Sequence, residues 1–544
     1  MNLLTEQWIP VRTLDGSRQW VRPDQLSDER IVDFDASRAD FKGALAQFVI
    51  GLLQTTSPVD SNVGWRKLLK TPPDQAALQK WFAAHSDAFE FDGNGARFMQ
   101  DFDLRVVEGE AIGIGGLFIE SPGENTIKNN SDHFIKRGQM DHLCPHCAAL
   151  ALFTLQVNAP SGGAGHRTGL RGGGPLTTLL VASSTPESPR SLWHSLWLNV
   201  QERGKFDAGS GDAEKLDMGF TYPWTNSIQH IQKEGGQVAP IQVHASHIFW
   251  AMPRRIRLDL DNVSEGLCEL CGRTSDRLIH QYVTQNHGLD YKGAWRHPFT
   301  PYYQLKDDML PMHPQPGGIG YRHWMGLVLG VPNEKRKVER AAVVERFFQD
   351  EVERRAGVEL RLWAFGFDMN NMKSRCWYES TMPLYGLTDC SPQALESLRE
   401  DVGVCLEGAE LVAEYLRNAV KNAWFARDAK GDFSFVDTSF WSRTEQDFYV
   451  LLKARIEAAK VGDFQDGVAF GERWLSTLFR AAKKLFDTDL VGAGPIERQN
   501  PARIAAAHNQ LIGCLGGPKL RKTLKLPDAV KPAKKIKPVA IKAK

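Results

Sequence analysis

The tetrapeptide CPHC at Cys144–Cys147 decides much of the fold, because a second tetrapeptide of the same spacing, CELC, follows at Cys268–Cys271. Two such pairs supply four thiolates, the ligand set of many structural zinc sites. The pairs lie about 120 residues apart, far more than a small zinc ribbon uses, so a metal would join two distant segments. The spacing therefore predicts a structural Zn²⁺ bound by Cys144, Cys147, Cys268 and Cys271.

A Cys-x-x-Cys pair also suits a thiol–disulfide oxidoreductase, in which the first sulfur attacks as a thiolate. Cys144 and Cys147 would then be the redox pair. Such enzymes work in the periplasm, whereas this chain shows no export signal, and they need no second pair. His142 and His146 are further possible ligands, but four thiolates need no help. The zinc interpretation is favoured, and a zinc ion held by four thiolates has no open position for catalysis.

Composition places the chain among soluble globular proteins. Its 544 residues suffice for two to four domains of about 150 residues, and it is 42% hydrophobic and 24% charged. No apolar run approaches the ~18 residues of a membrane helix, and the first residues lack the layout of a signal peptide. We expect a cytoplasmic protein.

Residues 1–388 are rich in glycine, proline and aromatic residues, and their periodic segments are short. Strands are predicted at Thr177–Ser183 and His247–Met252. Helices are predicted at Phe41–Gln54, Cys147–Gln156 and Lys337–Ala356. This mixture predicts a large α+β domain that contains the zinc site.

Residues 389–517 are predicted to be almost entirely helical. The first helix opens with Ser391 as N-cap and Pro392 at its first position, and its apolar residues alternate three and four positions apart. A second helix covers 444–459, a third contains RWLSTLFRAAKKLF and a fourth begins at Asn500–Pro501. The pattern predicts a four-helix bundle. His508, on an apolar face, is expected to be a core residue.

Residues 518–544 form a basic tail. Between Lys519 and Lys544 there are ten Lys or Arg and one acid, Asp528, although the whole chain carries only +1. Proline spaced among lysine predicts disorder. The tail is either a solubilising end or a loose arm that seeks phosphates. Because the rest of the chain is net negative, a nucleic-acid surface there must be a local patch.

Three loops of the first domain carry residues that suit nucleic acid. Leu117–Arg137 is rich in Lys and Asn, which can reach phosphates and base edges. Ala159–Pro175 holds seven glycines with His166, Arg167 and Arg171, and glycine lets backbone amides approach a phosphate. Phe365–Trp377 would place an amide and a thioether at a hairpin tip. A long surface loop, a flexible turn packed under an aromatic residue and an ordinary hairpin tip remain the respective alternatives.

No catalytic motif is found. The chain has no G-x-S-x-G, no H-E-x-x-H and no kinase signature. The glycine-rich loop fits neither a dinucleotide fingerprint nor a P-loop. Asp101 and Asp103 form a carboxylate pair, which we expect to be solvated in a turn. We predict that the protein is not an enzyme.

The order of these motifs resembles a known family. CPHC, the glycine loop, CELCG, WRHPFTPY at Trp295–Tyr302, GFDMNNMKS and the helical end follow one another as in the large subunit of Cascade, the type I-E CRISPR surveillance complex. That family is often called CasA. The resemblance runs from NLLTEQWIPV at Asn2–Val11 to the fourth bundle helix.

The resemblance implies a non-catalytic subunit that recognises the protospacer-adjacent motif in double-stranded target DNA. It implies duplex opening, R-loop formation and recruitment of a helicase-nuclease in antiviral defence. Other Cascade subunits, CRISPR RNA and target DNA are the implied partners, with structural zinc as the cofactor. The predicted DNA-binding residues are Lys128, Asn129, Asn130, Ser161, Gly162, Gly163, Ala164, Gly165, Arg167, Asn370, Asn371, Met372 and Lys373.

Three positions depart from the family pattern. The family has glycine where this chain has Ala164, glutamine where it has Met372, and lysine where it has Asn286. A methionine can wedge between bases but cannot hydrogen-bond well with a displaced base. Lys373 is left to compensate, and the motif that is read can differ.

Overall fold

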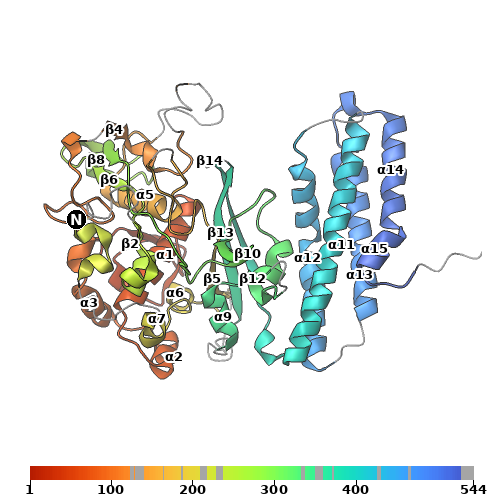
Figure 1. Cartoon of the computed structure of the whole chain (residues 1–544), viewed down its shortest axis with the longest axis horizontal. Coiled ribbons are helices and arrows are strands. Elements are labelled where there is room, and N and C mark those ends of the chain that lie inside the picture. Colours follow the sequence, from red (N-terminus) through yellow and green to blue (C-terminus); the bar gives the residue numbers. More distant parts are fainter. Residues whose placement is uncertain are drawn as a thin grey trace, which may run out of the picture. The chain divides into compact units, whose positions relative to one another are not determined.

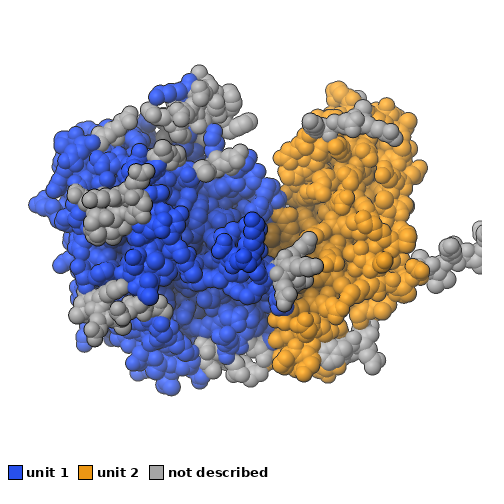
Figure 2. All heavy atoms as spheres, in the orientation of Figure 1, with its two compact units in different colours: residues 1–319, 326–388 blue, residues 320–325, 389–544 orange. Residues whose placement is uncertain are grey.

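The chain divides into two units, which Figure 2 colours separately. Unit 1 comprises Met1–Ile319 and Gly326–Thr388, and unit 2 comprises Gly320–Met325 and Asp389–Lys544. This computed structural model describes residues 1–108, 110–122, 128, 140–162, 165–185, 188–208, 217–227, 237–332, 337–349, 359–370, 373–425, 431–462 and 467–528. The predicted fold class, a mixed α+β region followed by helices, is confirmed.

The core of unit 1 forms around helix α1 (Ala39–Thr56), which is buried along almost its whole length. Because it is apolar on every side, it can pack against neighbours all round. Helix α5 (Pro145–Asn158) packs against it. Phe48 of α1 lies at the centre of an aromatic cluster, with ring centroids 5.2–5.9 Å from those of Trp8, Phe89, Phe98, Phe153 and Trp250.

Small antiparallel sheets and short helices surround this core (Figure 1). One sheet has the order β2-β1-β3 (Arg18–Val21, Ile9–Thr13, Ile31–Phe34), a second β4-β9-β6 (Glu110–Gly113, Gln281–Gln285, Arg255–Leu258), and a third β11-β10-β12 (Asp308–Pro311, Tyr302–Leu305, Val338–Glu339). Strands β7 (Val263–Leu267) and β8 (Thr274–Ile279) form a separate hairpin. The helices are α2 (Asn62–Lys70), α3 (Gln75–Ala83), α6 (Leu192–Trp197), α7 (Arg203–Asp207) and α9 (Ala342–Gln349).

The sheet that matters most for the site has the order β14-β13-β5. Strands β13 (Leu360–Asn370) and β14 (Lys373–Pro383) form a long antiparallel hairpin, and β5 (Thr177–Ala182) pairs with the other edge of β13. The hairpin packs so closely on α1 that position 43 has no room for a side chain. A Cβ added at Gly43 would lie 2.8 Å from the Phe365 ring. This contact fixes the hairpin to the core.

Two elements of unit 1 differ from the sequence prediction. His247–Met252 was predicted as a strand, but Ala245–Phe249 forms a 3₁₀ helix. Its aromatic residues fit the surface of α1, since an added Cβ at Gly51 would lie 2.9 Å from Phe249 and Trp250 donates its indole N–H to Thr55. The helix predicted for Lys337–Ala356 is a short strand, β12, followed by α9; residues 350–358 lie outside the described part.

Unit 2 is built from four long helices. They are α11 (Pro392–Trp424), α12 (Ser434–Lys460), α13 (Gly467–Lys484) and α14 (Pro501–Leu515), and α11 packs against the other three. The N-cap predicted at Ser391 is confirmed, because its side chain accepts a hydrogen bond from Ala394, and Asn500, where the fourth helix was predicted to begin, caps α14 in the same way through Arg503. Residues on the predicted seam of α11, among them Leu398, Val402 and Leu416, are buried.

Gly320–Met325 belongs to unit 2, although the sequence predicted one boundary at residue 389. Tyr321 stacks on Phe448 with ring centroids 4.4 Å apart, and its hydroxyl lies 2.8 Å from the hydroxyl of Thr444. His508 was predicted to be a core residue, but it is half-buried. Its Nε2 lies 3.4 Å from a carboxylate oxygen of Asp487.

The beginning of the basic tail is folded, whereas the sequence predicted disorder from residue 518. Pro518–Thr523 forms helix α15, and Leu520, Leu524 and Leu526 are buried. Leu524 packs against Gly408 of α11, where an added Cβ would lie 2.4 Å from a methyl group of Leu524. Leu526 packs against Gly471 of α13, where an added Cβ would lie 2.9 Å from a methyl group of Leu526. Residues 529–544 lie outside the described part of the chain.

Candidate metal centre and nucleic-acid interface

The four cysteines of the two Cys-x-x-Cys pairs meet in unit 1. Their sulfur atoms all lie within 4.8 Å of one another, and the Sγ atoms of Cys144 and Cys271 are 3.8 Å apart. Four sulfurs about 2.3 Å from a common Zn²⁺ in a tetrahedron lie about 3.8 Å apart. Their spacing and donor type therefore suit zinc, and no described histidine joins the cluster.

Helix α5 and the β7–β8 hairpin bring the cysteines together. Cys144 is the N-cap of α5 and Cys147 lies in its first turn, where the helix dipole favours thiolates. Cys268 and Cys271 lie in the turn between β7 and β8. Main-chain hydrogen bonds of 2.8 and 3.0 Å between Leu143 and Ile279 join the two segments beside the cluster.

The state of the thiols favours a metal site over redox catalysis. Cys144 is 2% exposed. Contact with Cys147 lowers the pKa of Cys144. Contacts with Cys268 and Cys271 and burial raise it by more, so the pKa is raised overall. Contact with Cys144 also raises the pKa of Cys147 and lowers that of Cys271 to about 7. A redox nucleophile needs an accessible thiol, whereas Cys144 is buried among the other three sulfurs.

The glycine-rich segment begins where α5 ends. Gly162 is exposed and Ser161 is half-buried, whereas Gly163 and Ala164 lie outside the described residues. Gly165 has φ +83, and an added Cβ there would lie 2.5 Å from Cβ of Asn286. Asn286, the position at which the family has lysine, is exposed. It therefore lies directly beside this part of the segment.

The second half of the segment is packed rather than exposed. Gly174 has φ +61, and an added Cβ would lie 2.7 Å from Cβ and 2.8 Å from the carbonyl oxygen of Phe367 in β13. Arg171 is buried and donates hydrogen bonds to Thr177, Thr300 and Gln47. Glycine thus serves two purposes within the described residues: Gly162 leaves the backbone exposed, and Gly174 allows close contact with the hairpin strand.

Replacing Gly174 with alanine is expected to destabilise unit 1 more than the same change at Gly16. Both residues have positive φ, +61 and +81, but nothing lies within 4 Å of an added Cβ at Gly16. Gly16→Ala should cost about 1–2 kcal/mol for the left-handed backbone, and Gly174→Ala about 1–3 kcal/mol more because the strand cannot move aside. Urea unfolding of both variants measures the difference. Equal costs would show that the contact is not rigid.

The tip of the β13–β14 hairpin lies a few residues beyond the contact between Gly174 and Phe367. Asn370 pairs with Lys373 at the ends of β13 and β14, and both side chains are exposed. Asn371 and Met372 lie between them in sequence and outside the described residues. Because Gly174 contacts Phe367 only three residues before Asn370, the glycine segment and the tip belong to one packed structure.

The structure describes only some of the other predicted DNA-binding residues. Lys128 is exposed, whereas Asn129 and Asn130 lie outside the described residues. The guanidinium of Arg167 lies 3.7 Å from Asp290 and is only 28% exposed, so binding DNA would require it to leave this carboxylate. Arg254, which lies against the glycine segment, was not predicted from the sequence, because nothing in its neighbouring residues signals that role.

The carboxylate pair also differs from its prediction. Asp101 is fully buried rather than solvated, and its carboxylate lies 2.6 Å from Nε of Arg255. It also accepts main-chain hydrogen bonds from Asp103 and Leu104, which closes a turn. Asp103 bonds with Ser227. Asp101 therefore shapes the loop before the β4-β9-β6 sheet.

Comparison with known proteins identifies the family. The family described as CRISPR-associated protein Cse1 matches residues 2–485. Among solved structures, CasA of Thermus thermophilus matches with a TM-score of 0.65 at 15% identity, covering 95% of this chain and 99% of that chain. Cse1 from Acidimicrobium ferrooxidans matches with a TM-score of 0.62 at 17% identity, covering 96% and 99%. A chain of a CRISPR RNA-guided surveillance complex matches with a TM-score of 0.64 at 16% identity, covering 95% and 99%.

These matches define a CRISPR-associated protein with the CasA fold. The chain belongs to the Cse1 family, and the resemblance found in its sequence is confirmed. Within the described residues, no helix has the length and apolar character needed to cross a membrane.

Proposed function

We propose that this chain is the non-catalytic large subunit of a cytoplasmic, CRISPR RNA-guided Cascade complex. It tests the protospacer-adjacent motif in double-stranded DNA, promotes duplex opening and R-loop formation, and helps to recruit a helicase-nuclease. Family membership supports this assignment. The further support is the contact of Gly174 with Phe367, which places the glycine segment beside the strand that ends at Asn370.

In this proposal two small structures probe the duplex. The segment Ser161–Gly165, in which Gly162 is exposed and Gly165 has Asn286 beside it, enters the minor groove, where the pattern of base edges is degenerate. The hairpin tip at Asn370–Lys373 then wedges into the stack, and unstacking costs a few kcal/mol per step. The guide RNA reads the remaining sequence by base pairing, so the protein needs to test only a short motif.

The zinc site has a structural role in this proposal. Zn²⁺ bound by Cys144, Cys147, Cys268 and Cys271 would hold the start of α5 against the β7–β8 turn. The glycine segment begins at the other end of α5, and Asn286 follows β9, the strand after β8. The metal therefore fixes the two chain segments that meet at Gly165. Four sulfur ligands leave no coordination position for water.

The proposal is tested with guide-loaded complex reconstituted with the full chain. The double variant Met372→Ala, Lys373→Ala is expected to weaken binding of motif-bearing duplex about tenfold to a hundredfold, since each lost contact of this kind costs about 1–3 kcal/mol. Assembly should remain unchanged. A binding titration on duplexes with randomised flanking motifs, with and without this chain, provides the measurement.

Lys306→Ala is the matched control, because Lys306 also follows a strand at a hairpin turn, between β10 and β11. It should leave binding unchanged. Equal losses of target binding and assembly in the double variant would contradict the wedge role. A complex that selects targets equally well without this chain would contradict the whole proposal.

A further inference from the structure

Arg254 is a buried arginine next to the glycine segment. It directly precedes β6 and is 9% exposed. Within the described part of the chain, no carboxylate forms an ion pair with it, and its Nε has no hydrogen-bond partner. A buried charge normally requires a partner, so the position of this guanidinium calls for an explanation.

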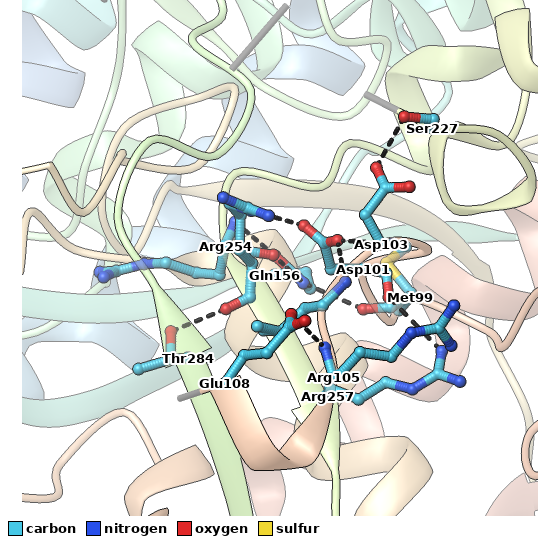
Figure 3. Close-up of polar contacts among 12 residues, drawn as sticks. Met99, Asp101, Asp103, Arg105, Glu108, Gln156, Ser227, Arg254, Arg257 and Thr284 are labelled. Atoms are coloured by element: carbon cyan, nitrogen blue, oxygen red, sulfur yellow. Dashed lines mark hydrogen bonds and ion pairs between the residues drawn. The ribbon is translucent and has the colours of Figure 1, made fainter. Parts of the chain in front are cut away.

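The main chain at Arg254 is fixed to the end of α5 by Gln156. The side-chain amide of Gln156 donates to the carbonyl oxygens of Arg254 (3.0 Å) and Met99 (3.2 Å), and its Oε1 accepts from the main-chain N–H of Arg254 (3.0 Å), as Figure 3 shows. Gln156 is fully buried. The base of the Arg254 side chain and the last turn of α5 are therefore held together.

The guanidinium extends from this fixed base to the glycine segment. Its Nη2 donates a hydrogen bond to the carbonyl oxygen of Pro160. An added Cβ at Gly162 would lie 2.6 Å from Nη1 and 3.1 Å from Nη2. The planar group thus lies against the backbone of residues 160–162, and glycine is the residue that leaves space for it.

The guanidinium also brings a positive charge to this backbone. Burial lowers the pKa of Arg254 to about 10, which still leaves the group protonated at neutral pH. Burial, and then the charge of Arg254, lower the pKa of His166 in the segment. A charge in a site of low dielectric acts more strongly than one in water. An anion that approaches the exposed backbone at Gly162 meets this charge.

We infer that Arg254 is the positioning residue of the glycine loop: it fixes the backbone of Pro160–Gly162 and supplies a positive charge that a DNA phosphate neutralises. This inference rests on the proposed function. It adds a residue outside the predicted DNA-binding set, one that acts through the loop backbone rather than by reading bases.

The test compares wild type, Arg254→Met and Arg254→Lys in the guide-loaded complex, with motif-bearing and motif-lacking duplexes at several salt concentrations. Arg254→Met is expected to reduce the affinity ratio between the two duplexes about tenfold and the salt slope by about 1. Arg254→Lys should restore the salt slope but not the full ratio, because lysine lacks the planar fork. Assembly of the complex should stay as in wild type.

Arg346→Met is the matched control. Arg346 is also buried in unit 1, 8% exposed, and donates to a carbonyl oxygen, that of Val200. Its loss should lower the melting temperature and leave both the ratio and the salt slope unchanged. An effect of Arg254→Met confined to melting temperature would overturn the inference, because that is the result of a purely structural role.

Gly162→Ala keeps the test decisive if Arg254→Met fails to fold, because the added methyl would lie 2.6 Å from Nη1 and the guanidinium would have to shift away from the backbone. It should lower the ratio as Arg254→Met does, and an unchanged ratio in Gly162→Ala and Arg254→Lys would overturn the inference. If the wild-type complex shows no preference between the duplexes, the proposed function fails and the inference fails with it. Selectivity retained in Arg254→Met overturns the inference alone.

Discussion

Replacing Cys147 with serine is expected to abolish stoichiometric zinc binding and to destabilise unit 1 strongly. The four sulfurs join the first turn of α5 to the β7–β8 turn, and the loop between them spans much of unit 1. Metal binding free energy at such a site is folding free energy. The loss should be about 3–5 kcal/mol, comparable to breaking a buried charged group. That corresponds to roughly 5 °C in melting temperature for a unit of this size.

Metal content and thermal unfolding of the purified chain measure both effects. Cys376→Ser provides the control, since Cys376 is a half-buried cysteine of the same unit that takes no part in the cluster. It should retain about one zinc per chain and a wild-type melting temperature. Full zinc content in Cys147→Ser, or no zinc in the wild-type protein, would contradict the assignment.

Truncating the chain after Gly517 is the second large expected effect. It removes α15 together with Leu520, Leu524 and Leu526, which are at most 7% exposed. Each fully buried leucine contributes about 1.5–3 kcal/mol, so we expect unit 2 to lose roughly 4.5–9 kcal/mol. Truncation after Asp528 should leave its stability unchanged. Circular dichroism during urea unfolding compares the two forms.

A point variant separates packing from chain length. Leu524→Asp places a carboxylate against Gly408 and should destabilise unit 2 by about 3 kcal/mol or more. Leu14→Asp is its control, because Leu14 is 53% exposed and surface changes usually stay within about 0.5 kcal/mol. If the form that ends at Gly517 unfolds as the full chain does, the segment has no stabilising role.

Local sequence patterns predicted the elements whose signal is contained in one segment. The seam of α11 followed from apolar spacing, and the cap at Ser391 and the start of α14 at Asn500–Pro501 followed from residue type. The 3₁₀ helix at Ala245–Phe249 did not follow, because its aromatic residues have strand propensity and only their fit against α1 decides the conformation. Tertiary packing outweighs local preference there.

The folded start of the tail shows a different failure. Its average composition is that of a disordered, lysine-rich segment, and this average concealed three leucines at 520, 524 and 526. Their partners are Gly408 and Gly471, more than 50 residues away along the chain. A composition argument cannot detect such partners.

The candidate site was predictable to the extent that its chemistry is local. Spacing alone indicated the four cysteines, and glycine content indicated only that the backbone of Ala159–Pro175 could come close to a ligand. The packing of Gly174 on Phe367 and the place of Arg254 beside Gly162 depend on contacts between distant segments. Asn286 could be singled out only through the resemblance, and its contact with Gly165 required the structure.

The assignment of Gly320–Met325 to unit 2 means that the polypeptide passes between the units three times, at residues 319–320, 325–326 and 388–389. After a single protease cut at any one of these crossings, at least one of the two fragments still contains residues of both units. A fragment that starts at residue 389 also lacks Tyr321, so the rings of Trp441 and Phe448 lose one of their aromatic neighbours. A bundle excised for expression or domain exchange therefore needs Gly320–Met325 to keep this packing.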